Sequence, residues 1–199
     1  MSDRRLMPAA LTTLLWMAPA LIQPALAHTG DTTASGFQAG FLHPITGTDH
    51  LVAMVAVGLW GAQLGNPAIW VLPIIFPLVM ALGSVLGITG IMVPYPEVII
   101  GLSAVALGIA VALRLRPPLW AAAILVGVFA IFHGYAHGQE LPSAADPISY
   151  GVGFVTATGL LHLCGIVIGA SVRWPVGERL VRVSGVAIGC VGTFFLWSL

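Results

Sequence analysis

The chain has 199 residues, of which 58% are hydrophobic and only 7% are charged, whereas a soluble domain carries about 25% charged residues. Its acidic and basic residues balance to a formal net charge of zero, and all seven basic residues are arginines, so no basic surface for nucleic acid is expected. The composition excludes an ordinary soluble domain and predicts an all-α, polytopic transmembrane helix bundle whose partner is the lipid bilayer.

The first segment, residues 1–27, has the three parts of a secretory signal peptide. Two arginines near the start precede an apolar stretch, and Ala25-Leu26-Ala27 then supplies the small residues of a cleavage site. Cleavage after Ala27 would leave His28 as the first mature residue, on the outer side of the membrane. The alternative is an uncleaved signal anchor.

The mature part, residues 28–199, is predicted to form one domain of six transmembrane helices. About 20 apolar residues span a bilayer, and breaks containing proline or glycine separate the apolar stretches. The predicted spans are 37–64, 68–91, 96–115, 118–138, 148–170 and 179–198.

Charge gives the predicted orientation. The five arginines that remain after cleavage lie where the third span meets the fourth and where the fifth meets the sixth: Arg114, Arg116, Arg173, Arg179 and Arg182. Positively charged loops face the cytoplasm, whereas the loop 138–147 has two acidic residues and no basic one. The sequence therefore predicts a multi-pass protein of the bacterial inner membrane with both mature termini in the periplasm.

The first predicted span contains His43, Asp49 and His50, and ionisable residues inside a membrane are costly and usually functional. His43 and His50 are two helical turns apart, which is roughly 10 Å along the axis. They can share one ion only if the helix is broken, and Pro44 is placed to disturb it. Asp49 is either a metal ligand in a distorted segment or a carboxylate that orients a neighbouring imidazole.

The fourth predicted span ends with a second polar stripe. His133 and His137 are four residues apart on one helical face, an arrangement that chelates divalent metals, and Glu140 continues the same face. Imidazole combined with carboxylate suits nickel, cobalt and zinc. The two polar stripes together therefore predict a site for a divalent transition metal, with no prosthetic group.

Three other ionisable residues are interpreted individually, and two of them have two interpretations each. His162, in the fifth span, is either a further metal ligand or a hydrogen-bonded packing residue. His28 is either a free terminus or a group that collects metal outside the membrane. Glu97, at the outer start of the third span, is interpreted as a solvated interfacial charge.

Two motifs resemble those of a known family. His43-Pro44-Ile45-Thr46-Gly47-Thr48-Asp49-His50 and Phe132-His133-Gly134-Tyr135-Ala136-His137-Gly138-Gln139-Glu140 are similar to the two signatures of the HupE/UreJ family. The resemblance implies a secondary permease for nickel, or sometimes cobalt, linked indirectly to the maturation of hydrogenase or urease. Zinc is the less expected cargo. The functional residues it implies are His43, Asp49, His50, His133, His137 and Glu140.

The predicted path begins at His137 and Glu140 at the outer mouth and continues to His50 near mid-membrane, so that the ligands act as successive stations. A permease is not an enzyme. Two alternatives remain open at this point: a membrane-embedded metallohydrolase of the zinc type, and a metal-binding sensor or accessory protein without transport. The sequence does not indicate an oligomeric state.

Overall fold

The structure is a computed structural model, which describes residues 36–141 and 146–199. The predicted signal peptide and His28 lie outside these ranges. Within them the chain is all helical, with seven α-helices, one short 3-10 helix and no strand, which confirms the all-α prediction. The elements are α2 (Gly36–Thr46), α3 (Thr48–Leu64), α4 (Ala68–Ile88), α5 (Pro96–Ala112), α6 (Leu119–Gln139), α7 (Pro147–Gly169), η2 (Ala170–Arg173) and α8 (Pro175–Ser198).

Local sequence explains where several helices begin. Proline stands in the first turn of α5, α7 and α8. Backbone N–H groups in a first turn have no acceptor within the helix, so the missing N–H of proline costs no hydrogen bond there. At α7 the Asp146 carboxylate also accepts a hydrogen bond from the Ser149 backbone N–H, which caps the helix. The last helix starts at Pro175 rather than at residue 179 as predicted, and Arg179 and Arg182 lie in its first turns.

Not every predicted span meets a length and hydropathy test for crossing a membrane. Among the described residues, α4, α6, α7 with η2, and α8 meet it, and α2 with α3 form a fifth span if the bent pair is counted as one. α5 is apolar but has only 17 residues. The protein is thus a helical membrane protein, and the sixth crossing, through α5, stays a prediction.

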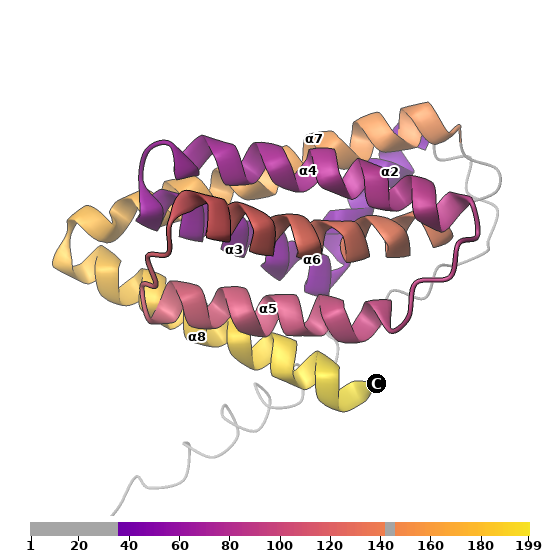
Figure 1. The fold of residues 1–199 in the computed structure, drawn as a ribbon. Helices are drawn as coiled ribbons and strands as arrows, with labels where there is room; N and C mark the ends of the chain where they lie inside the picture. The colour runs from indigo at the N-terminus through magenta and orange to yellow at the C-terminus, as the bar shows by residue number, and fades with distance from the viewer. Residues whose placement is uncertain (1–35, 142–145) are drawn as a thin grey trace, which may run out of the picture. The chain divides into compact units, whose positions relative to one another are not determined.

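The helices pack in long neighbouring pairs. α4 lies along α6, α5 along α8, and both α2 and α3 along α7 (Figure 1). Glycine makes the close approaches possible: a Cβ on Gly134 would overlap the Met80 carbonyl oxygen of α4, and one on Gly58 would overlap the His162 carbonyl oxygen of α7. Small residues of this kind let membrane helices pack backbone to backbone.

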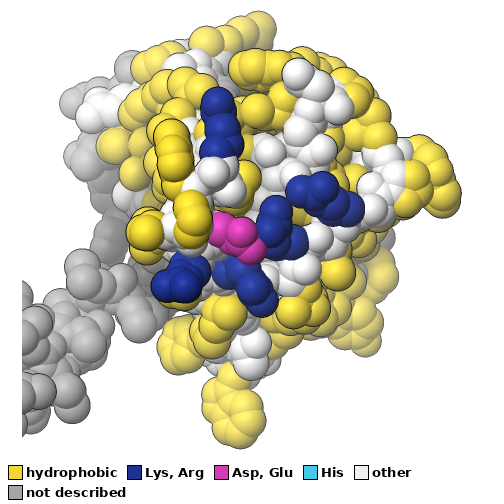
Figure 2. All heavy atoms as spheres, turned by 90° about the vertical axis from the view of Figure 1, so that its left-hand side faces the viewer, with side chains coloured by type: hydrophobic (Ala, Val, Ile, Leu, Met, Phe, Trp, Pro, Cys, Tyr) yellow, Lys and Arg dark blue, Asp and Glu magenta, His cyan; other side chains and the backbone are white. Residues whose placement is uncertain are grey.

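One end of the bundle carries the arginines. Figure 2 shows this end, where basic side chains surround a small acidic patch. Arg114 donates to the Glu178 carboxylate at 2.7 Å, and Arg182 donates through Nε to the Ala112 carbonyl oxygen at 3.0 Å. These contacts join the end of α5 to the start of α8.

The first predicted span is broken. α2 and α3 meet at an angle of 78°. Pro44 remains inside α2, and the break falls at Gly47, whose backbone is extended with ψ 104°. Gly47 still links the two helices, because its N–H donates to the His43 carbonyl and its own carbonyl accepts from Leu51. The predicted disruption is present, three residues after the proline.

Candidate metal centre

The bend at Gly47 brings the two histidines of the first motif together. The ring centroids of His43 and His50 lie 6.0 Å apart with the rings tilted, whereas a straight helix would separate the residues by roughly 10 Å. His43 lies in the last turn of α2 and His50 in the first turn of α3, so each ring approaches the same space from a different helix axis. The break in the helix therefore brings the two imidazoles close together, as binding of one shared ion requires.

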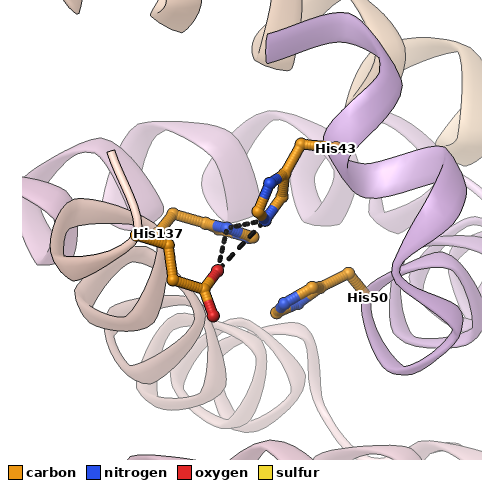
Figure 3. Close-up of side chains that lie close together, drawn as sticks. His43, His50 and His137 are labelled. Atoms are coloured by element: carbon orange, nitrogen blue, oxygen red, sulfur yellow. Dashed lines mark hydrogen bonds and ion pairs between the residues drawn. The ribbon is translucent and has the colours of Figure 1, made fainter. Parts of the chain in front are cut away.

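The last turn of α6 completes the cluster. His137 Nδ1 lies 3.1 Å from His43 Nε2, and the Glu140 carboxylate lies 3.1 Å from His43 Nε2 and 3.9 Å from His137 Nδ1. The rings of His50 and His137 have centroids 4.2 Å apart. Figure 3 shows the imidazoles of His43, His50 and His137 turned towards one space.

This geometry fits a single metal ion. One ligand atom from each of His43, His50, His137 and Glu140 lies within 4.8 Å of every other. Ligand atoms that share one ion at about 2.1 Å lie roughly 3.0 to 3.4 Å apart. The four ligand atoms are therefore close to the spacing that one shared ion requires.

The hydrogen bonding of the imidazoles also favours a metal ion at this cluster. His50 Nδ1 and His137 Nε2 are buried and have no hydrogen-bond partner, although a buried polar group without a partner is costly. The short contact between His43 and His137 requires that one ring nitrogen donates a proton to the other, or that a cation lies between two lone pairs. A divalent cation between His43 Nε2 and His137 Nδ1 would remove that unfavourable contact, and the unpartnered Nδ1 of His50 offers a further ligand.

Aromatic rings of α7 form one wall of the cluster. Phe154 lies with its ring centroid 4.3 Å from that of His137 and 6.1 Å from that of His43, and Tyr150 also lies 6.1 Å from His43. Exclusion of water on this side strengthens charge interactions inside the cluster.

Asp49 lies beside the cluster. Its carboxylate is 3.7 Å from His50 Nε2, and it is not one of the four residues whose ligand atoms converge. Of the two interpretations of Asp49, this placement favours a carboxylate that orients the His50 imidazole, a common arrangement next to metal ligands.

The other two histidines lie deeper. His133 Nδ1 shares a hydrogen bond with the Phe129 carbonyl at 2.9 Å, which leaves Nε2 buried without a partner, and its ring is 5.3 Å from that of His50. His162 is 1% exposed and contacts the Phe76 ring. Phe76 also contacts His133, with centroids 5.4 Å apart, so an apolar ring borders both imidazoles. His162 is not part of the four-residue cluster.

A cavity of about 130 Å³ reaches the cluster from the end of the bundle opposite the arginines. Its polar lining comes from Asp49, His50, Glu97 and Glu140, together with residues near the end of α8. Glu97 is exposed, as expected of a solvated interfacial charge, and it also lines this cavity, although nothing in the spacing of the sequence links it to His50. Only the packing of α5 against α3 brings the two together.

The structure does not separate the ligands along a path in the predicted order. His137 and Glu140 were placed at an outer mouth and His50 near mid-membrane, yet His50 and His137 are in ring contact. The bend at Gly47 causes the difference, because it folds His50 back to the level of the last turn of α6. Only His133 and His162 remain at deeper levels.

Comparison with known proteins bears on the same residues. The family described as HupE / UreJ protein matches residues 15–195. The chain belongs to the HupE/UreJ family. It is also 45% identical over 187 residues to Protein HupE of Rhizobium leguminosarum bv. viciae, an alignment that covers 94% of this chain and 96% of that relative. No solved structure matches the chain.

Family membership confirms the resemblance seen in the two motifs. The match includes both His43–His50 and 132–140, and the structure places three histidines and one glutamate from these two motifs around one space. HupE/UreJ proteins are membrane proteins associated with nickel or cobalt rather than a class of enzymes, which agrees with a metal site inside a helical bundle.

Proposed function

We propose that the protein is a secondary permease that carries a divalent transition-metal cation, nickel or else cobalt, across the bacterial inner membrane. The cluster of His43, His50, His137 and Glu140 carries the proposal, because it offers borderline nitrogen ligands and one carboxylate to an ion that enters from one end. Membership of the HupE/UreJ family supports this cargo and a beneficiary such as hydrogenase or urease.

The orientation follows from charge. The arginine end faces the cytoplasm by the positive-inside rule, so the cavity and the cluster open to the periplasm. This orientation needs six crossings by the helices after residue 35, with α5 as the third, and it holds whether or not the predicted signal peptide is cleaved.

Below the cluster the bundle is closed. Met54, Val57, Trp60 and Phe76 are at most 1% exposed, and about 21 Å of α3 separates His50 from Leu64 at the arginine end. A bound cation therefore needs a rearrangement of helices to reach the cytoplasm. The chain has no lysine and so no P-loop for ATP, which leaves ion gradients, membrane potential or intracellular capture of the metal to drive transport.

Purified protein in liposomes tests the proposal. We expect trace Ni²⁺ to enter vesicles that contain the protein and not protein-free vesicles. Turnover of lipid without metal entry would contradict a permease and indicate a metalloenzyme. Binding of Ni²⁺ with neither flux nor turnover would contradict it in favour of a sensor or accessory protein.

A more specific prediction concerns His162, which we propose as a further metal ligand that lies deeper in the bundle than the cluster, beyond Phe76. His162→Gln should reduce the rate of Ni²⁺ entry about tenfold, because the cation would lose a buried imidazole ligand whose two ring nitrogens have no hydrogen-bond partner, and a tenfold change in rate corresponds to about 1.4 kcal/mol. Equilibrium binding at the outer cluster should stay within about twofold of wild type. Cys164→Ala, an exposed position on the same helix, is the matched control, and an unchanged rate in His162→Gln would show that His162 only packs.

A further inference from the structure

We propose that Glu97, with Asp49 and Glu140, forms an acidic vestibule that captures a hydrated divalent cation before the histidines replace its waters. The inference rests on the proposed function, since it describes how that cargo reaches the cluster. It assigns a binding role to Glu97, which lies outside both motifs.

The vestibule is the cavity described above. Its three carboxylates come from three helices: Asp49 from α3, Glu97 from α5 and Glu140 from the end of α6. His50 lines the same cavity, although it is only 5% exposed, and its buried Nδ1 has no hydrogen-bond partner. An unpartnered imidazole at the wall of an acidic cavity is a ligand for a cation.

The size of the cavity fits an ion that still carries water. One water molecule requires about 10 to 15 Å³ of such space, and the cavity offers about 130 Å³. Several waters and one small cation can therefore be held at once. The four-residue cluster next to it is too tight for this, since its ligand atoms lie within 4.8 Å of one another.

Within residues 36–141 and 146–199, no basic group neutralises the charge of the vestibule. No arginine lines the cavity, and among the described residues no ion pair includes Glu97, while Glu140 and Asp49 pair only with imidazoles. Along α5, Arg114 lies about 26 Å from Glu97, which is about three Debye lengths at physiological salt. The field at the mouth thus attracts free aqua cations and repels anionic metal chelates.

Glu97 also has a simpler role, which the test must separate from this one. It lies in the first turn of α5, where a carboxylate stabilises the helix macrodipole by about 0.3–1 kcal/mol. That role would alter stability slightly, but it would not make metal capture depend on ionic strength.

The experiment measures the association rate of Ni²⁺ with purified protein by stopped flow, and in parallel the concentration dependence of Ni²⁺ entry into liposomes. At low ionic strength Glu97→Gln should lower the association rate about three- to tenfold and raise KM by a similar factor, with kcat unchanged. The difference should shrink towards zero at high salt. Glu97→Asp should restore most of the association rate.

Asp146→Asn is the matched control. It removes one carboxylate from the same end of the bundle, outside the cavity, and asparagine is also a good N-cap. We expect it to associate with Ni²⁺ at the wild-type rate. Equal rates for wild type and Glu97→Gln at low salt, or a loss that persists at high salt, would overturn the vestibule. The association rate tests the vestibule even if the liposomes show no entry of Ni²⁺. Failure of the vestibule can therefore be distinguished from failure of the proposed permease function.

Discussion

Replacing His50 or His137 by alanine should weaken Ni²⁺ binding at least a hundredfold and reduce uptake to the level of vesicles without protein. Each imidazole has a buried nitrogen with no hydrogen-bond partner, and the two rings are in contact. Loss of a residue that merely supports a metal ligand costs 10- to 100-fold in affinity, so loss of a ligand should cost no less. Equilibrium titration of the purified variants with Ni²⁺ measures the effect.

Thr48→Ala is the matched control for these variants. Thr48 is exposed in the first turn of α3, one residue after the bend, and is not among the converging ligands. We expect wild-type affinity from it. Wild-type affinity in a folded His50→Ala or His137→Ala protein would remove that residue from the site.

Gly134→Ala should destabilise the bundle by about 3 kcal/mol and also lower metal affinity. A Cβ at Gly134 would overlap the Met80 carbonyl oxygen of α4, which is backbone and cannot rotate away. Overpacking of this kind costs about 1–3 kcal/mol, occasionally more. Because Gly134 lies between His133 and His137, separation of α6 from α4 would also move their imidazoles. Thermal unfolding in detergent, with and without Ni²⁺, measures both effects.

Gly127→Ala tests whether the effect of Gly134→Ala comes from packing. Gly127 is on the same helix, and its added Cβ would meet only Ile75 Cγ2 at 4.0 Å. Alanine is also the better helix former by about 1 kcal/mol. We expect Gly127→Ala to be as stable as wild type or slightly more so, and equal losses in both variants would contradict the packing argument.

Hydropathy and turn residues were sufficient to predict most helices, because the length of an apolar helix is set by the bilayer. Proline in the first turn and glycine at breaks fixed several boundaries to within a few residues. α8 begins four residues before the predicted span 179–198, because Pro175 occupies its first turn and the polar residues that follow, Arg179 and Arg182 among them, continue the helix.

The metal-binding residues were predictable for a different reason. Buried ionisable residues are rare in a membrane, so His43, His50, His137 and Glu140 were recognisable individually. Their convergence was not, because it depends on the angle between α2 and α3, and a pattern along the chain shows that a helix breaks without showing by how much. Glu97 had no such signal, since it meets His50 only through the packing of α5 beside α3.

X-ray absorption spectroscopy of the Ni²⁺-loaded protein tests the central claim most directly, because it reports the atoms bound to the metal. The account predicts nitrogen and oxygen ligands at about 2.0–2.1 Å, with scattering from three imidazoles that falls to two in His50→Ala. A shell of oxygen alone, a sulfur ligand, or a spectrum unchanged by His50→Ala would contradict it.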